Sequence, residues 1–290
     1  MNQATTDGTL HELRVLLEEE IQAGRLTLPV MPDVALRARE AAASAASSAR
    51  DLAQILEADP ALAARILKMA NSAMYAGLSE IRDLSHAIVR LGAAMVVAVV
   101  VGAAGKEVFR TKDPAFRGLL RDSWEASVHA AAVARLLADR ASMPREEGML
   151  AGLLHASGDP ILVQLVEDLV HQGRIERPSV ETMRELLRLL APRAAVRLLS
   201  KWGLPETIVR AIEYQQAPGA APEPFRKAAA LVTLASLAGR GSVAGEPVEE
   251  LVRHLGSHPA AGLLLLDEEL ARELLDRARE EGREIAQAFT

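Results

Sequence analysis

The sequence predicts an all-α protein made of two helical lobes, and three observations carry that prediction. Apolar residues recur at helical spacing, prolines and acidic residues stand where helices begin, and no hairpin turn joins two strand-like runs. Half of the 290 residues are hydrophobic and a quarter are charged, which is enough to build a buried core. Aromatic residues make up only 3%, so Ala, Leu and Val have to form this core.

The N-terminal part predicts short helices separated by clear punctuation. An amphipathic helix is expected at about residues 9–23, and the prolines of segment 28–32 (Leu-Pro-Val-Met-Pro) separate it from the next helix. Ser48 with Asp51 resembles a capping box at a helix start. Asp59 precedes a proline whose fixed φ suits a first helical turn, and the helix that it caps should end near residues 71–72.

The most apolar run of the chain covers residues 91–105. It is too short to span a bilayer, which requires about 20 apolar residues, so we expect a buried core helix. Residues 95–101 are rich in Val and are the one stretch where a strand is conceivable, but no second run offers it a partner. Gly92 is expected to permit close packing of helix backbones.

A polar break at residues 107–114 divides the chain. It ends in Asp113-Pro114, which repeats the capping device, and Leu266, Leu270 and Leu274 form an apolar stripe near the C-terminus. We therefore expect an N-terminal helical lobe over residues 1–110, and a second helical lobe with a C-terminal helical extension over residues 111–290.

Charge and composition exclude several classes of function. The net charge of −6 argues against a general nucleic-acid binder. The absence of cysteine excludes disulfides, thiolate catalysis and iron–sulfur clusters. The N-terminus lacks the pattern of a signal peptide, so we expect a cytoplasmic protein that has no membrane partner.

The order of the N-terminal motifs resembles a known family. Segment 28–32 is followed by residues 51–62 (DLAQILEADPAL), 65–75 (RILKMANSAMY) and 87–92 (AIVRLG). This string resembles the HDOD domain, a bacterial signalling domain related to the HD-domain and HD-GYP phosphohydrolases. The resemblance covers roughly residues 26–240, and it implies an N-terminal helical bundle followed by a degenerate HD-type bundle.

The same resemblance locates the positions where HD enzymes hold metal ions. Those enzymes bind one or two ions through His and Asp side chains, and the ions activate a water that attacks a phosphate ester. The matching positions in this chain are Ala126, His155, Ala156, Gln215, Gln216 and Ser236. Alanine cannot coordinate a metal, and amide or hydroxyl oxygens are poor donors for transition metals. The resemblance thus implies no bound metal, no cofactor and no phosphohydrolase activity.

Two further histidines lie close together near the C-terminus. His254 and His258 are four residues apart, which would place both on one helix face, but Gly256 and Pro259 interrupt that helix. Because closed metal sites need four ligands, no metal site is predicted there.

These observations predict a non-catalytic signalling module that acts by binding other signalling proteins in trans. Two alternatives stay open: a divergent metal-dependent phosphohydrolase using His155, and a nucleotide receptor without hydrolysis. The candidate partner surface is a cleft between the lobes that includes Asn71, Ser72 and Arg90, because polar groups at helix ends beside a cleft are a default binding site. The rival interpretation is that these three residues only lock the lobes together.

Overall fold

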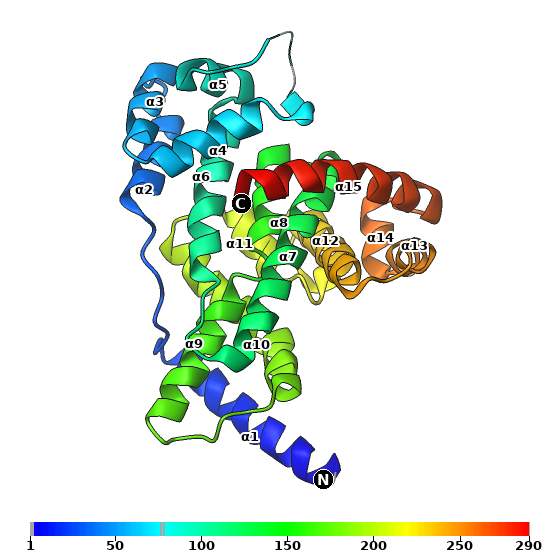
Figure 1. The fold of residues 1–290 in the computed structure, drawn as a ribbon. Helices are drawn as coiled ribbons and strands as arrows, with labels where there is room; N and C mark the ends of the chain where they lie inside the picture. The colour runs from blue at the N-terminus through cyan, green and yellow to red at the C-terminus, as the bar shows by residue number, and fades with distance from the viewer. Residues whose placement is uncertain (1–2, 76, 78, 290) are drawn as a thin grey trace.

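The computed structural model describes residues 3–75, 77 and 79–289, and in this part of the chain it contains helices and no strand. The all-α prediction is confirmed (Figure 1). The first six helices are α1 (Gln3–Gln22), α2 (Asp33–Ala43), α3 (Ala49–Glu57), α4 (Pro60–Ala70), α5 (Leu84–Leu91) and α6 (Ala93–Val108). The Val-rich stretch considered as a strand lies within α6.

The remaining helices form the larger part of the molecule. They are α7 (Pro114–Leu137), α8 (Arg145–Leu154), α9 (Gly158–His171), α10 (Val180–Lys201), α11 (Glu206–Glu213), α12 (Arg226–Ala244), α13 (Val248–Ser257), α14 (Pro259–Leu264) and α15 (Glu268–Phe289). Three 3₁₀ turns, η1 (Ala73–Tyr75), η2 (Ala138–Ala141) and η3 (Pro218–Ala220), complete the fold.

The helix starts that the sequence predicts are confirmed. Ser48 and Asp51 form a reciprocal capping box at the start of α3. The Asp59 carboxylate accepts from two backbone N–H groups of α4, and the Asp113 carboxylate accepts from the Ala115 N–H at the start of α7. Each cap satisfies donors that a helix start would otherwise leave unpaired.

Gly92 has a different role from the one expected. It is the corner residue between α5 and α6, whose axes differ in direction by 106°. Its φ of +80° lies in the region that glycine adopts without steric cost, and a Cβ built on it would meet no atom within 4 Å. The expectation of close backbone packing at Gly92 is therefore wrong: the residue is needed for its backbone conformation.

Helix α7 runs through the centre of the larger part, between α8, α12 and α15 (Figure 1). Two glycines bring its neighbours close: a Cβ on Gly152 of α8 would lie 2.5 Å from the Ala130 carbonyl oxygen, and one on Gly239 of α12 would lie 2.2 Å from the Ala126 carbonyl oxygen. These glycines thus allow the backbones of α8 and α12 to contact the backbone of α7. This arrangement brings the family's ligand positions on α7 and α12 together.

Helix α1 lies at the far end of the molecule from α2 and packs on α10 (Figure 1). Its residues Leu13, Leu17 and Ile21 share a hydrophobic core with α9 and α10. The buried Glu20 carboxylate receives Arg25 Nε at 2.5 Å and Arg174 Nη2 at 2.8 Å, which fixes the end of this helix. The first segment of the predicted division, 1–110, therefore contributes helices to both ends of the molecule, and the division itself stays a prediction.

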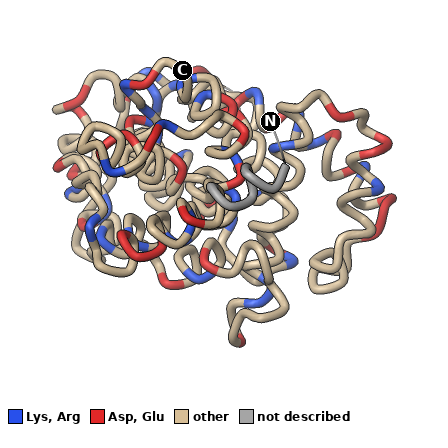
Figure 2. Tube along the Cα trace, turned by 90° about the horizontal axis from the view of Figure 1, so that it is seen from below, with Lys and Arg blue, Asp and Glu red and all other residues tan. Residues whose placement is uncertain are grey.

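One stretch, Arg145–His171, is long and apolar enough to meet the length and composition of a membrane span. It comprises α8 and α9, and 83% of its most apolar window is buried inside the fold, as in a core helix pair. Figure 2 shows Lys and Arg interspersed with Asp and Glu along the chain.

Candidate functional site

The positions that the sequence resemblance matches to the metal ligands of HD enzymes come from four parts of the fold. Ala126 lies in α7, His155 and Ala156 in the turn between α8 and α9, Gln215 and Gln216 after α11, and Ser236 in α12. Ala126, His155, Gln215 and Ser236 are buried. Gln215 and His155 are in direct contact, because the Gln215 amide donates to the His155 carbonyl oxygen at 3.2 Å.

His155 is held as a neutral side chain. Its Nδ1 lies 2.7 Å from the Gly152 carbonyl oxygen, and the ring is almost fully buried. Burial lowers the pKa of His155 to about 4, and the charge of Arg240 contributes in the same direction, against the opposing effect of the Gly152 hydrogen bond. The imidazole is therefore uncharged at neutral pH.

Ser236 carries a cationic partner. Arg240, one helical turn further along α12, donates a hydrogen bond from Nη1 to Ser236 Oγ. Arg240 as a whole is exposed, but desolvation of its guanidinium lowers its pKa, while the charge of Asp159 raises it and the charge of Arg188 lowers it further. A guanidinium remains protonated in proteins, so a positive charge stands beside two of the family's ligand positions, Ser236 and His155.

Asp159, near the start of α9, adds a carboxylate that no sequence motif had indicated. Its Oδ2 accepts from Ser123 Oγ of α7 at 2.5 Å. Burial raises the pKa of Asp159 to about 6, although the Ser123 hydrogen bond and the charge of Arg240 both oppose the increase. We refer to Ser123, His155, Asp159, Ser236 and Arg240 as the central polar cluster.

Helical spacing in the sequence could have pointed to these additional residues. Asp159 is four residues beyond His155, and Arg240 is four residues beyond Ser236. Within a helix, residues four apart share a face, so Arg240 was predictable as a neighbour of Ser236. Asp159 could not be related to His155 by helical spacing, because the chain turns between His155 and α9.

Gln216 does not join the central polar cluster. It is exposed, and its amide donates to the Arg188 carbonyl oxygen of α10. Ala126 and Ala156 offer no donor atom, and Ser236 is engaged by a guanidinium. A divalent ion needs at least three converging donors, and transition metals favour imidazole, thiolate or carboxylate. The side chains at the family's ligand positions therefore do not fit a metal ion.

The structure places the candidate cleft residues around one loop. Asn71 ends α4, and its side chain accepts from the Ile81 N–H at 2.8 Å and donates to the Ile81 carbonyl at 2.7 Å and the Leu67 carbonyl at 3.0 Å. Arg90 belongs to the last turn of α5, and its guanidinium donates to the Ala70 and Ser79 carbonyl oxygens.

Ser72 differs from these two residues. Its Oγ is buried without a hydrogen-bond partner among the described residues. The contacts of Asn71 and Arg90 are those expected of residues that fix a loop. The assignment of the three residues as a partner surface stays a prediction.

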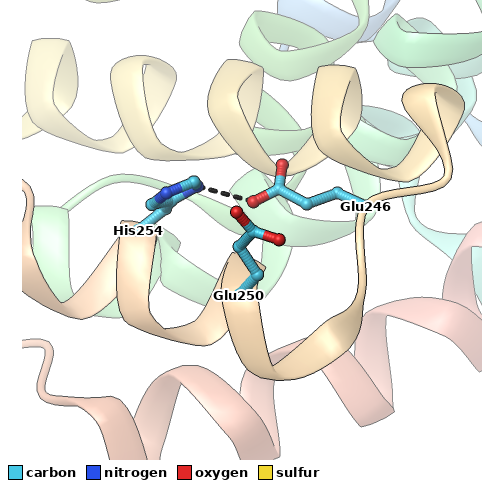
Figure 3. Close-up of side chains that lie close together, drawn as sticks. All are labelled: Glu246, Glu250 and His254. Carbon is cyan, nitrogen blue, oxygen red and sulfur yellow. Dashed lines mark ion pairs between the residues drawn. The ribbon is translucent and has the colours of Figure 1, made fainter.

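His254 and His258 lie on different helices. His258 caps α14, where its Nδ1 accepts from the Ala260 N–H at 3.1 Å. His254 instead approaches Glu246, with Nδ1 and Oε1 2.5 Å apart, and Glu250 lies nearby, so that ligand-type atoms of the three residues fall within 4.8 Å of one another (Figure 3). Glu250 stands in the first turn of α13, where the helix dipole favours a negative charge.

Several solved structures share this fold. A candidate metal-dependent phosphohydrolase from Shewanella amazonensis SB2B superimposes with a TM-score of 0.71 at 21% identity, covering 92% of this chain and 99% of that one. An HDOD domain protein of unknown function from Geobacter sulfurreducens gives 0.67 at 26% identity, covering 96% and 99%. A candidate signal transduction protein from Marinobacter aquaeolei VT8 gives 0.63 at 25% identity, covering 99% and 66%.

The fold thus defines a protein of the HD-like helical class. Within this class, residues 28–218 match the HDOD domain, and the chain belongs to the HDOD domain family. The resemblance found in the sequence is confirmed. An uncharacterized protein of Treponema pallidum (strain Nichols) is 21% identical over 233 residues, and the matched region covers 79% of this chain and 45% of that protein. This chain thus corresponds to less than half the length of that curated relative.

Proposed function

We propose that this HDOD protein is a non-catalytic bacterial signalling module that acts by binding other proteins in trans. The observation that carries the proposal is the set of side chains at the ligand positions: one neutral, buried His155, two alanines, and Ser236 bonded to a guanidinium. Hydrolysis of a phosphate ester by an HD-type enzyme relies on bound metal to activate water. Without side chains that can bind this metal, the protein keeps a surface for binding partners but loses metal-activated hydrolysis.

The test is a hydrolysis assay on the purified full chain, supplied with Mn²⁺, Fe²⁺ or Mg²⁺. The substrates are a general phosphodiester, cyclic dinucleotides and hyperphosphorylated guanine nucleotides. We expect no turnover above the buffer, and no difference between the wild type and His155→Ala. A metal-dependent rate that His155→Ala abolishes would contradict the proposal and support a divergent phosphohydrolase.

A thermal-shift series with the same nucleotides separates the proposal from the third interpretation. If the protein works only through protein partners, its melting temperature should be unchanged when these nucleotides are added. An increase in Tm that rises with nucleotide concentration, without turnover, would instead identify a nucleotide receptor, because a ligand that binds the native state stabilises it by mass action.

A further inference from the structure

Arg240 brings a permanent positive charge into the part of the fold where HD enzymes hold metal ions. Its Nη1 donates to Ser236 Oγ, and Ser236 stands where those enzymes carry an aspartate. Gly239 beside it packs against the Ala126 carbonyl oxygen, and Ala126 stands where they carry a histidine. Arg240 therefore lies next to the contact between α7 and α12, the two helices that carry Ala126 and Ser236.

The carboxylate on which this charge acts comes from a third helix. Asp159 of α9 accepts from Ser123 Oγ, and no Lys or Arg in the described part of the chain forms an ion pair with it within 4 Å. Arg240 is the cation whose charge acts on the Asp159 carboxyl, and the same charge acts on the His155 imidazole. Asp159 is half-buried and Arg240 is exposed, so solvent screens part of the attraction, and the guanidinium offsets only part of the desolvation cost of the carboxylate.

We infer that the Arg240 guanidinium is the resident cation of the central polar cluster, that it provides the positive charge which a metal ion would provide there, and that it excludes a divalent ion. This inference rests on the proposed function and extends it. Loss of the ligands explains why a metal is not held. Arg240 is itself exposed, but its guanidinium is hydrogen-bonded to the Ser236 position. It adds a second barrier, because a divalent ion bound at that position would be repelled by the adjacent positive charge.

The two barriers can be separated by restoring ligands with and without Arg240. The first variant, Ala156→Asp with Ser236→Asp, returns two carboxylates while it keeps Arg240. The second adds Arg240→Met, which removes the charge but retains a long side chain. Mn²⁺ binding to each full-length protein is measured by the decrease of the free-ion electron paramagnetic resonance signal.

We expect the triple variant to bind Mn²⁺ at least about tenfold more tightly than the double variant, since a neighbouring cation disfavours a second one. A matched control carries Arg240→Lys in place of Arg240→Met; it keeps the charge and should bind as weakly as the double variant. Equal affinity of the double and triple variants would overturn the inference.

A second measurement avoids the restored ligands, which could prevent folding. In a thermal double-mutant cycle near neutral pH, Arg240→Met should lower Tm more in the wild type than in an Asp159→Asn background, because only the former is left with an uncompensated carboxylate. Arg145→Met provides the matched control: Arg145 pairs with Asp139 and should give the same change in both backgrounds. Additive effects of Arg240→Met and Asp159→Asn would overturn the inference.

The failures of the two proposals are distinguishable. If wild-type protein binds Mn²⁺ and His155→Ala abolishes that binding, the proposed function is contradicted, and the inference with it. If the wild type binds no Mn²⁺ but the double and triple variants bind alike, the inference is contradicted and the proposed function stands.

Discussion

Replacement of Asp159 by asparagine should stabilise the protein at neutral pH and leave its stability unchanged in acid. Burial of the carboxylate carries a desolvation cost that raises its pKa from the ordinary 3.8 to about 6, even with Ser123 and Arg240 nearby. Asparagine resembles the protonated acid: its carbonyl oxygen still accepts from Ser123 Oγ, and it carries no charge. The variant therefore keeps the hydrogen bond and removes the desolvated charge.

The magnitude is set by the pKa shift. A group whose pKa is raised by folding contributes stability that is fully present below the unfolded pKa and is lost as pH rises through the folded one. For Asp159 this window runs from 3.8 to about 6. At about 1.4 kcal/mol per pH unit the upper limit is about 3 kcal/mol. Because Asp159 is only partly buried, solvent screening reduces this, and we expect a gain of about 1–3 kcal/mol near pH 7.

His155 has the opposite pH dependence. Its folded pKa of about 4 lies below the ordinary 6.5, so the stability that it contributes is present above pH 6.5 and is lost as pH falls toward 4. The two contributions oppose each other between pH 4 and 6 in the wild type. In Asp159→Asn only the His155 contribution remains, so the free energy of unfolding should rise more steeply with pH.

Urea unfolding of the wild type and Asp159→Asn at a series of pH values measures this difference. Asp276→Asn on the exposed face of α15 serves as the matched control and should change stability little at any pH. An Asp159→Asn variant that is destabilised near pH 7, or that differs from the wild type equally near pH 4 and near pH 7, would refute the reasoning.

Three further substitutions test the packing. Asn71→Ala should lower the free energy of unfolding by about 1–3 kcal/mol, because it leaves backbone groups of the loop without hydrogen-bond partners. Binding of a partner protein should then fall only as far as the variant unfolds. Loss of binding at an unchanged Tm would instead identify Asn71 as part of a binding site. Gly239→Ala should cost about 3 kcal/mol or more in a urea titration, since its Cβ would lie 2.2 Å from the Ala126 carbonyl oxygen, and a near-neutral result would contradict the close helix contact. Gly92→Ala should cost about 1–3 kcal/mol in the same assay, from its backbone conformation (φ +80°, ψ 151°) alone, because the site has room for a methyl group.

The helix boundaries were predictable because they are encoded locally. A capping Asp before a proline at Asp59 and Asp113 specifies a helix start within a few residues of chain, and the structure has both. The docking of α1 on α10 was not predictable, because its apolar stripe would suit any hydrophobic partner. The role of Gly92 was also missed, since neighbouring residues do not reveal whether a glycine is required for space or for its φ.

Only some residues of the candidate site could be predicted from the sequence. The family pattern located His155 and Ser236, but it could not show what replaces the missing ligands. Arg240 and Asp159 are 81 residues apart in the chain (240 − 159) and become electrostatic neighbours only when α9 and α12 both pack around α7. That proximity depends on tertiary structure, so helical spacing alone could relate Arg240 to Ser236 but not to Asp159.

Elemental analysis of the purified full chain tests the central claim most directly. The protein is loaded with Mn²⁺, Fe²⁺ or Zn²⁺, passed through a desalting column and assayed for bound metal beside His155→Ala. The ligand positions and the resident guanidinium predict far less than one ion per chain in both proteins. A stoichiometry of about one ion per wild-type chain, lost in His155→Ala, would contradict the account.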